Sequence, residues 1–471
     1  MKKYDFIIVG CGISCLYFLK KLKGLNIQYK TAILEKKPFP GGRIQSLTIG
    51  NEVIDSGAFR FTDKHYLVKS LLNNYEIKDI EELDSKISTK VTPNLFRKFS
   101  EFLDECKNSK YDNYSFGEVA KSKFTMAEYE TLKLWYGYDQ KWEESNCRNL
   151  ATHLLPNYDS KKYFHVKNGL SQLVNLMYEE LKENYDFFFG EKVMKLADGN
   201  NIYTMSGKHF TAENIIFACP PHFIKNIEGT EQMTPLLVGV GEQVLNRIYA
   251  KFNNNSWFPK EVVHCFEPIS LIVPVNEEII MVSYSTNRSA RYWMQQEMNG
   301  TLWKTLRDDL IANGIKIGNE KPVWIKQNYW NPGTHYYKPG FNAKKTQNLS
   351  FKPIHNKKWH IIGESFSENQ GWMEGALENT ELFFKKFFSG KLQMPDKKYS
   401  LKEVEKHNKD NDAWLAIHGN VYNITNWIDQ HPGGSVIKYG IGKDATNMFI
   451  SAGHHEDALE FMNHYKIGIL E

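Results

Sequence analysis

The sequence predicts a Rossmann-type α/β domain, an α+β domain interleaved with it along the chain, and a small α+β domain at the C-terminal end. Three observations support this prediction. A glycine turn joins an apolar strand to a helix near residue 10, a strand followed by glycines returns near residue 360, and a polar stretch with glycine and proline precedes residue 399. A chain of 471 residues is long enough for about two to four domains.

The first forty residues have the pattern of a dinucleotide-binding turn. The apolar run 6–9 predicts a strand, and the leucines that follow at helical spacing predict a helix. Gly10 allows the tight turn, and Gly12 lets backbone N–H groups near Ser14 approach a phosphate at the helix N-terminus. Glu35 ends the next apolar run, where a carboxylate can accept hydrogen bonds from a ribose. A Gly-x-Gly turn also occurs without a nucleotide, so the surrounding pattern carries the prediction.

The run from Gly10 to Arg43 resembles the FAD-binding N-terminus of the flavin-dependent amine oxidase superfamily, which includes phytoene-desaturase-like and protoporphyrinogen-oxidase-like enzymes. The resemblance implies that Glu35 binds the adenosine ribose and that Gly42 and Arg43 lie on the pyrophosphate side of FAD. Cys15 departs from the family pattern, because it occupies the third fingerprint position in place of a residue without a side chain.

The next segment combines a strand with a helical insertion. Residues 53–61 predict a strand and a small-residue turn, which in the resembled family pass close to the isoalloxazine ring, so Phe59 and Arg60 are expected there. Residues 63–155 look mainly helical, with helices expected at 66–72, 95–106 and 126–135. Their aromatic side chains are more often core than a substrate pocket; they include Trp135, Tyr136, Tyr138 and Trp142.

A second α/β stretch and a mixed stretch follow. Val193 lies in an expected strand, and in the resembled family the matching residue contacts adenine through its backbone. Residues 212–218 predict a buried parallel strand that prolines end. Residues 235–350 predict a substrate domain, with strands at 247–252, 270–275 and 279–285 and one helix from Met294 to Ile311.

The chain then returns to the nucleotide. A strand at 359–362 leads to Glu364, and a small-residue helix start follows at Trp372 and Met373. Such a helix N-terminus can stabilise the negative charge of a reduced flavin. By resemblance, Glu364 binds the FAD chain, Met373 donates its N–H to the ring, and Trp372 contacts the ring.

Two residues are catalytic candidates by resemblance, Arg247 and Trp372. Arg247 aligns where amine-oxidising members have a lysine near flavin N5, and Trp372 can form one wall of an aromatic amine cage whose other wall falls near Gly333. An amine is therefore one candidate substrate, and dehydrogenation of a C–C or C–O bond remains open.

The C-terminal segment closely resembles cytochrome b5 from Tyr399 to Leu470. His431 stands before a Pro-Gly-Gly turn, and a second histidine stands beyond the next expected helix. One imidazole on each face of a b-type haem fills both axial positions of the iron, so that the haem only passes electrons. His454 and His455 are both candidates for the second ligand; the family spacing favours His454, which makes His431 and His454 the predicted iron ligands.

Composition restricts partners and location. The net charge is +4, and we find no Lys/Arg cluster with interleaved aromatic residues, which argues against nucleic acid. No stretch approaches the ~20 apolar residues of a membrane span, so we expect no stable membrane anchor. Six scattered cysteines fit a reducing compartment, and we expect a cytoplasmic protein.

The sequence thus predicts an FAD-dependent oxidoreductase of amine-oxidase type that oxidises a small organic substrate and passes electrons to a haem, with an external electron acceptor as partner. The alternatives are an oxygen-reducing oxidase or desaturase with the haem domain as a docking module, and a non-catalytic redox carrier. The expected domains are an FAD-binding domain (1–80, 156–234, 351–390), a helical insertion with the substrate domain (81–155, 235–350), a linker (391–398) and a haem domain (399–471).

Overall fold

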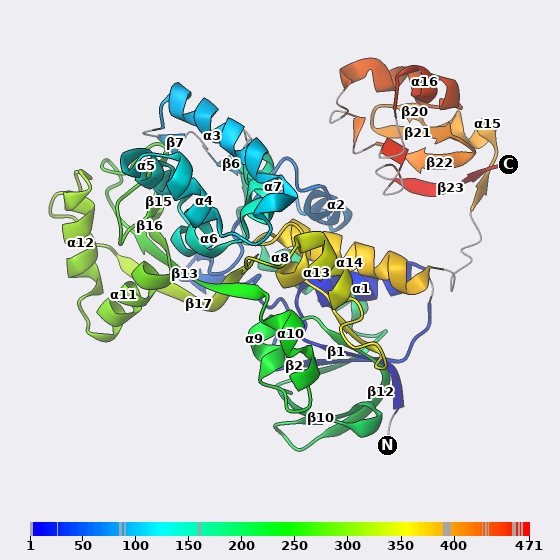
Figure 1. Cartoon of the computed structure of the whole chain (residues 1–471), viewed down its shortest axis with the longest axis horizontal. Helices are drawn as coiled ribbons and strands as arrows, with labels where there is room; N and C mark the ends of the chain where they lie inside the picture. The colour runs from blue at the N-terminus through cyan, green and yellow to red at the C-terminus, as the bar shows by residue number, and fades with distance from the viewer. Residues whose placement is uncertain are drawn as a thin grey trace. The chain divides into compact units, whose positions relative to one another are not determined.

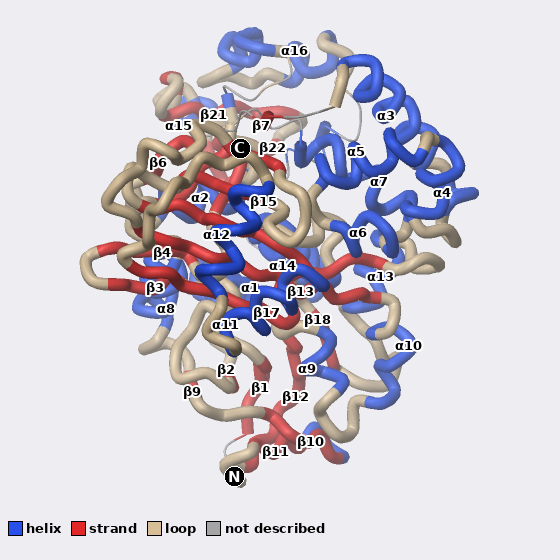
Figure 2. Tube along the Cα trace, turned by 90° about the vertical axis from the view of Figure 1, so that its left-hand side faces the viewer, coloured by secondary structure: helices blue, strands red, loops and turns tan. Residues whose placement is uncertain are grey.

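The computed structural model describes residues 3–25, 27–83, 87–88, 91–158, 162–389, 397–425, 427–428, 431, 433–454, 458–459, 462 and 465–471. The chain divides into two compact units, Met1–Phe384 and Lys385–Glu471, whose elements Figures 1 and 2 label. Within the described residues, no helix is both long enough and apolar enough to cross a bilayer.

A seven-stranded sheet organises the first unit. Strand β1 lies between β12 and β2 and is parallel to both. Its apolar residues are buried, as is usual for a parallel strand with both faces covered. The carboxyl ends of β1, β2 and β12 therefore meet at one edge. The order is β10-β11-β12-β1-β2-β9, with β18 beside β12; the bounds are β1 Lys3–Val9, β2 Thr31–Glu35, β9 Asp186–Phe189, β10 Val193–Ala197, β11 Asn201–Thr204, β12 His209–Phe217 and β18 Trp359–Ile361.

Helices α1 (Ile13–Gly24) and α14 (Met373–Phe388) lie side by side in both views. Phe18 of α1 contacts the rings of Phe383 and Phe384 of α14 at 5.9 and 5.7 Å between centroids. The N-termini of α1 and α14 lie close together, since the Ser14 hydroxyl donates to the Ala376 carbonyl at 3.4 Å. Helix α8 (Ser171–Leu181) also packs on α1.

The second sheet has six strands around the long strand β13 (Val240–Lys251), in the order β17-β13-β16-β15-β14-β7. The prediction of one helix from Met294 to Ile311 is wrong: α11 (Asn287–Met298) ends before Gly300, and α12 (Leu302–Ala312) begins after it. Gly300 has φ +70°, which ends an α-helix. The other strands are β7 Ile87–Ser88, β14 Val262–His264, β15 Leu271–Pro274, β16 Ile279–Thr286 and β17 Trp324–Tyr337.

The expected helical insertion forms a layer with its own core. Phe99 and Trp142 are fully buried and stack at 5.8 Å between ring centroids. Capping boxes fix the starts of α4 and α5, at Ser115 and Thr125. The helices are α3 Pro93–Cys106, α4 Phe116–Lys123, α5 Met126–Tyr136, α6 Asp139–Glu144 and α7 Cys147–Tyr158.

Short elements connect these layers. Strands β3 (Ser46–Ile49) and β4 (Glu52–Asp55) form a hairpin that leads into the loop at residues 56–59. A three-stranded sheet and helix α2 follow. Their bounds are β5 Arg60–Thr62, β6 Ile80–Leu83, β8 Tyr163–Val166 and α2 Tyr66–Asn74.

The second unit is a five-stranded sheet in the order β19-β23-β22-β21-β20 with helices on it. Its core includes Leu415, Tyr422 and Ile424. The helical segments η6 (Gly434–Gly440) and α16 (Thr446–Ser451) follow the sheet's inner strands in sequence. The strands are β19 Lys398–Tyr399, β20 Asn408–Lys409, β21 Asp412–Ile417, β22 Asn420–Asn423 and β23 Lys466–Leu470.

Candidate cofactor and substrate sites

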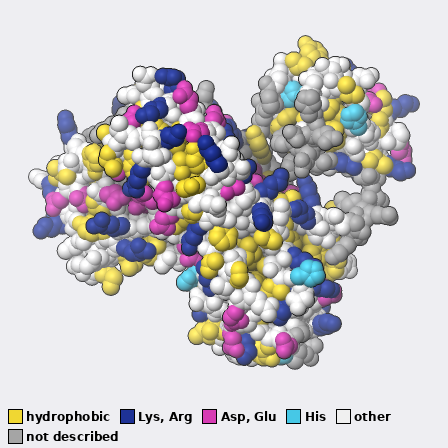
Figure 3. Space-filling view, viewed as in Figure 1, with side chains coloured by type: hydrophobic (Ala, Val, Ile, Leu, Met, Phe, Trp, Pro, Cys, Tyr) yellow, Lys and Arg dark blue, Asp and Glu magenta, His cyan; other side chains and the backbone are white. Residues whose placement is uncertain are grey.

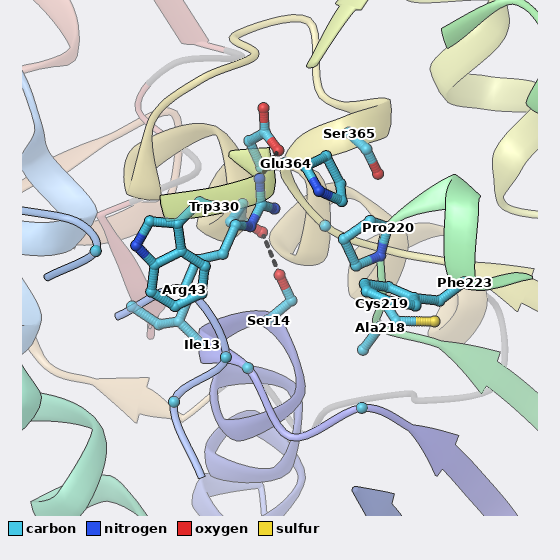
Figure 4. Close-up of a pocket in the computed structure, with 18 of the residues that line it drawn as sticks. Ile13, Ser14, Arg43, Ala218, Cys219, Pro220, Phe223, Trp330, Glu364 and Ser365 are labelled. Carbon is cyan, nitrogen blue, oxygen red and sulfur yellow. Dashed lines mark hydrogen bonds and ion pairs between the residues drawn. The ribbon is translucent and has the colours of Figure 1, made fainter. Parts of the chain in front are cut away.

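A cavity of about 880 Å³ lies at the carboxyl ends of the parallel strands of the first unit. Strands β1, β2 and β12 and the starts of α1 and α14 all contribute to its wall, and Figure 4 shows this wall around Ser14. The structure thus brings eleven predicted site residues into one cavity: Gly10, Gly12, Ser14, Glu35, Gly42, Arg43, Val193, Arg247, Glu364, Trp372 and Met373.

The glycine turn has a conformation that only glycine readily adopts. Gly10 has φ +102°, and a Cβ there would lie 2.8 Å from the carbonyl oxygen of Ala218. Gly12 caps α1, whose first turn contains no acidic residue of its own, and Gly12, Ile13 and Ser14 at the positive end of the helix dipole line the cavity. Backbone N–H groups at such a turn can bind an anionic group.

Glu35 is buried and held in place at the end of β2. Its Oε2 accepts the Cys11 backbone N–H at 2.7 Å, and its Oε1 accepts the Lys37 N–H at 2.8 Å. A carboxylate has about four acceptor positions, so capacity remains for hydroxyl donors in the cavity.

Arg43 and Glu364 also line the cavity (Figure 4). They form an ion pair with Nη1 and Oε2 2.8 Å apart. The Arg43 Nη1 also donates to the Gly333 carbonyl at 3.0 Å, while its other N–H groups have no partner within the described residues. His335 Nδ1 lies 2.8 Å from the same Glu364 oxygen. Although burial alone would raise it, Arg43 and His335 hold the pKa of Glu364 well below its usual value.

Both oxygens of Glu364 are engaged within the protein, since Oε1 accepts the Gly371 N–H at 2.7 Å. Glu364 therefore positions Arg43 and the loop before α14, which gives it a role besides the predicted contact with the FAD chain. His335 was not found by sequence reasoning. It is buried on β17, and no local motif marks it.

The loop after β4 contacts strands β13 and β17 of the second sheet, through Arg247 and Trp330. A side chain at Gly57 would collide with the Arg43 carbonyl, and the Gly57 carbonyl accepts a hydrogen bond from Arg247. The Arg247 guanidinium stacks on Tyr284 at 4.9 Å. Asp55, just before the loop, is buried, and its Oδ1 accepts from the Ser46 hydroxyl at 2.6 Å and from the Leu170 N–H at 3.0 Å.

The pH dependence of stability tests this buried acid. Burial raises the pKa of Asp55 to about 7, against the hydrogen bonds from Ser46 and Leu170. Since the folded protein then binds more protons than the unfolded chain, Asp55 lowers the free energy of unfolding progressively as pH rises from about 4 to about 7. Each pKa unit corresponds to about 1.4 kcal/mol. Asp55→Asn keeps an oxygen for both donors, so we expect a flatter pH profile and higher stability at pH 8.

Denaturant unfolding between pH 4 and pH 8 measures the effect. Asp308→Asn, on the exposed side of α12, removes the same charge outside the core and serves as the control. If the free energy of unfolding of Asp55→Asn changes with pH in parallel with that of the wild type, the raised pKa of Asp55 is contradicted.

A second cavity, of about 140 Å³, adjoins the first and shares Arg247, Tyr284, Trp372 and Met373 with it. The predicted residues Phe59 and Arg60 line this cavity and not the first.

The aromatic residues of the helical layer divide between core and cavity. Trp135, Tyr136 and Trp142 belong to the core of the layer, as expected, and Tyr138 packs against it. Tyr136 and Tyr138 also line the second cavity. The hydroxyls of Tyr138 and Tyr284 are hydrogen bonded at 2.7 Å. Trp372 lines both cavities and packs edge-on against His65, while Gly333 lies in the wall of the first.

In the second unit, His431 and His454 face one another with ring centroids 5.9 Å apart. The Nδ1 of His431 donates to the Gly434 carbonyl at 3.2 Å, and the Nδ1 of His454 donates to the Phe449 carbonyl at 3.1 Å. Because carbonyls only accept, both rings carry the Nδ1 proton, which leaves each Nε2 with a free lone pair.

This arrangement fits a metal held between the two rings. Metal–imidazole bonds of about 2.0 Å on each side, added to the size of the rings, give centroids roughly 6 Å apart. Gly433 is required next to His431, because a Cβ there would lie 2.7 Å from the ring. The competing candidate His455 lies outside the described residues.

Both units are similar to known proteins. Residues 8–75 match the NAD(P)-binding Rossmann-like domain, and residues 400–471 match the cytochrome b5-like heme/steroid binding domain. The solved structure of wild-type putrescine oxidase bound to putrescine superimposes with a TM-score of 0.68 at 15% identity, covering 82% of this chain and 99% of that one. A redesigned variant of that enzyme gives 0.67 at 14% identity with the same coverage.

Curated relatives match the C-terminal part. Cytochrome b5 of Drosophila melanogaster is 47% identical over 75 residues, 16% of this chain and 56% of that protein. Cytochrome b5 isoform B of Arabidopsis thaliana is 43% identical over 74 residues, 16% of this chain and 55% of that protein. The chain thus spans about half the length of these relatives. The predicted resemblance and fold class are confirmed: the chain joins the amine-oxidase fold, with its Rossmann-type domain, to a C-terminal cytochrome b5-like domain.

Proposed function

We propose that this protein is an FAD-dependent oxidoreductase of amine-oxidase type that oxidises a small organic substrate and passes the electrons to a b-type haem ligated by two histidines. The observation that carries the proposal is the presence of two cofactor sites in one chain. One is the cavity at the strand ends of the first unit, and the other is the facing pair His431 and His454.

The residues of the cavity fit FAD from end to end. Glu35 would accept hydrogen bonds from the adenosine ribose, and the backbone near Val193 would lie along the adenine. The N-terminus of α1 and the unused N–H groups of Arg43 would bind the pyrophosphate. The start of α14 at Met373 would stabilise negative charge on the ring. Bound FAD would supply two-electron oxidation of the substrate.

The residues of the second unit fit haem. The fixed Nδ1–H tautomer of each histidine leaves Nε2 for the iron, and hydrogen bonding of the other ring nitrogen is the usual way in which such ligands are oriented. Since both axial positions would be occupied, the haem would supply one-electron transfer only.

Direction of electron flow follows from the sites present. The sequence contains one glycine fingerprint, so electrons are expected to enter from an organic substrate instead of a nicotinamide. Putrescine oxidase is the amine-oxidising protein whose fold the chain shares, which supports an amine as the first substrate class to test.

The decisive experiment is the visible spectrum of the purified full-length protein, followed by anaerobic mixing with pools of amines, amino acids and polyenes. We expect flavin and haem bands together, and bleaching of the flavin band by one pool. A protein that retains FAD but is reduced by none of the pools would favour the redox-carrier alternative.

Substitution of the FAD contacts gives a quantitative test. Hydrogen bonds to charged groups contribute about 1.5–3 kcal/mol each, so Glu35→Ala and Arg43→Ala should each weaken FAD binding by about tenfold or more. FAD content and affinity measured by fluorescence check this. Glu213→Ala, an exposed glutamate on β12, is the control. Unchanged FAD affinity in both variants would refute the assignment.

A further inference from the structure

Lys141 is a cation of the second cavity with little compensation from the protein. It lies on α6, and its Nζ approaches the Gln370 carbonyl at only 3.5 Å. Within the described residues it forms no ion pair, whereas Lys121 and Lys133 of the same helical layer both pair with Glu143, at 2.8 and 2.9 Å. The negative charge of Glu364 acts on Lys141 without forming an ion pair with it. A partly buried ammonium with one long hydrogen bond and no ion pair is poorly compensated, which points to a ligand.

Two buried hydroxyls of the same cavity have no hydrogen-bond partner in the described residues. They are the Ser145 Oγ, at the end of α6, and the Tyr337 hydroxyl, at the end of β17. Both side chains are 2% exposed. The Asn146 N–H donates to the Tyr337 carbonyl at 2.7 Å, which holds these two chain segments together.

The cavity as a whole is positive. Three cations line it, namely Arg60, Lys141 and Arg247. One carboxylate also lines it, that of Glu368, which accepts a hydrogen bond from Gln347. The charges of Arg60 and Arg247 lie over the rings of Tyr163 and Tyr284, at 4.5 and 4.9 Å. In the part of the chain that the structure describes, no aromatic ring covers the Lys141 ammonium, and burial, partly offset by the charge of Glu364, lowers its pKa to about 8.

We propose that Lys141, together with the hydroxyls of Ser145 and Tyr337, forms a subsite for a carboxylate group of the substrate. A carboxylate is the acceptor that an ammonium and two hydroxyl donors bind together. The inference rests on the proposed function, because the subsite adjoins the cavity assigned to FAD. It makes the substrate a small acid-bearing molecule, such as an amino acid, and disfavours diamines. A water occupies about 30 Å³ of liquid, so the cavity of about 140 Å³ suits a short acid arm.

The test uses the full-length FAD-loaded protein with butyrate and butylamine as probes. Isothermal calorimetry should show binding of butyrate and none of butylamine. Lys141→Met should weaken butyrate binding about tenfold or more, because it removes a charge-assisted hydrogen bond. Lys141→Arg should retain it, and Lys121→Met, which removes the same charge outside the cavity, should match the wild type.

Tyr337→Phe separates ligand binding from folding. Since its hydroxyl lacks a partner in the described residues, its removal should leave the melting temperature unchanged or raised, while butyrate binding weakens. Butyrate affinity that is the same in the wild type, Lys141→Met and Tyr337→Phe would overturn the subsite, as would preferential binding of butylamine. FAD content, measured first, keeps the two proposals apart: absence of FAD refutes the proposed function, whereas FAD without Lys141-dependent binding refutes only the subsite.

Discussion

We expect His431→Ala and His454→Ala each to abolish the six-coordinate, low-spin haem spectrum of the full-length protein. The reason is that each ring would supply one Nε2 lone pair to the iron, and the ring centroids lie 5.9 Å apart. Loss of one imidazole would leave an axial position open and remove one of the two bonds between the protein and the iron. Visible spectroscopy and extracted haem content measure the result, and both should fall while FAD content stays unchanged.

The adjoining histidine provides the control. His455→Ala should leave the spectrum intact, because the family spacing assigns ligation to His454. A damaging His455→Ala with a harmless His454→Ala would move the second ligand by one residue. If both His431→Ala and His454→Ala retain the low-spin spectrum, the haem does not bind at this site.

Features encoded by neighbouring residues were predictable. The turn at Gly10 and Gly12 needs a strand before it and a helix after it. The residues that predict the strand, the turn and the helix all lie within about twenty positions of one another. Glu35 was likewise predictable, because it ends an apolar run. Such local patterns were enough to bring Gly10, Gly12 and Glu35 to one edge of the cavity, because parallel strands have their carboxyl ends on one side.

Contacts between distant segments were not predictable in the same way. Arg43 was expected to face the pyrophosphate, but its ion pair with Glu364 joins residues 321 positions apart and requires the complete fold. His335 reaches the same cluster from β17. Lys141 lies on the short helix α6, where no local motif marks it. It lines the second cavity only because α6 packs near β17 in the complete fold.

The break at Gly300 shows a different limit. A glycine within an apolar helical pattern is tolerated at a cost of about 1 kcal/mol, so the sequence from Met294 to Ile311 reads as one helix. The structure uses the same glycine at φ +70° to turn between two helices.

The distribution of surface charge was also not predictable from the net charge. Figure 3 shows acidic and basic side chains interspersed on the visible face.

The largest functional effect concerns electron transfer within the chain. When the FAD-loaded protein is mixed anaerobically with a reducing substrate, we expect the flavin absorbance to fall first and the reduced haem bands to sharpen second. Both cofactor sites belong to one polypeptide, so the second rate should be independent of protein concentration. Stopped-flow absorbance at several protein concentrations measures both steps.

His431→Ala should keep the first phase and lose the second completely, because its substitution leaves the cavity of the first unit intact and removes the haem ligand of the other unit. A second rate that rises in proportion to protein concentration would mean transfer between molecules. Haem that stays oxidised while the flavin turns over with oxygen would refute the transfer itself and assign the chain to the oxygen-reducing oxidases, with the cytochrome b5-like domain as a docking module.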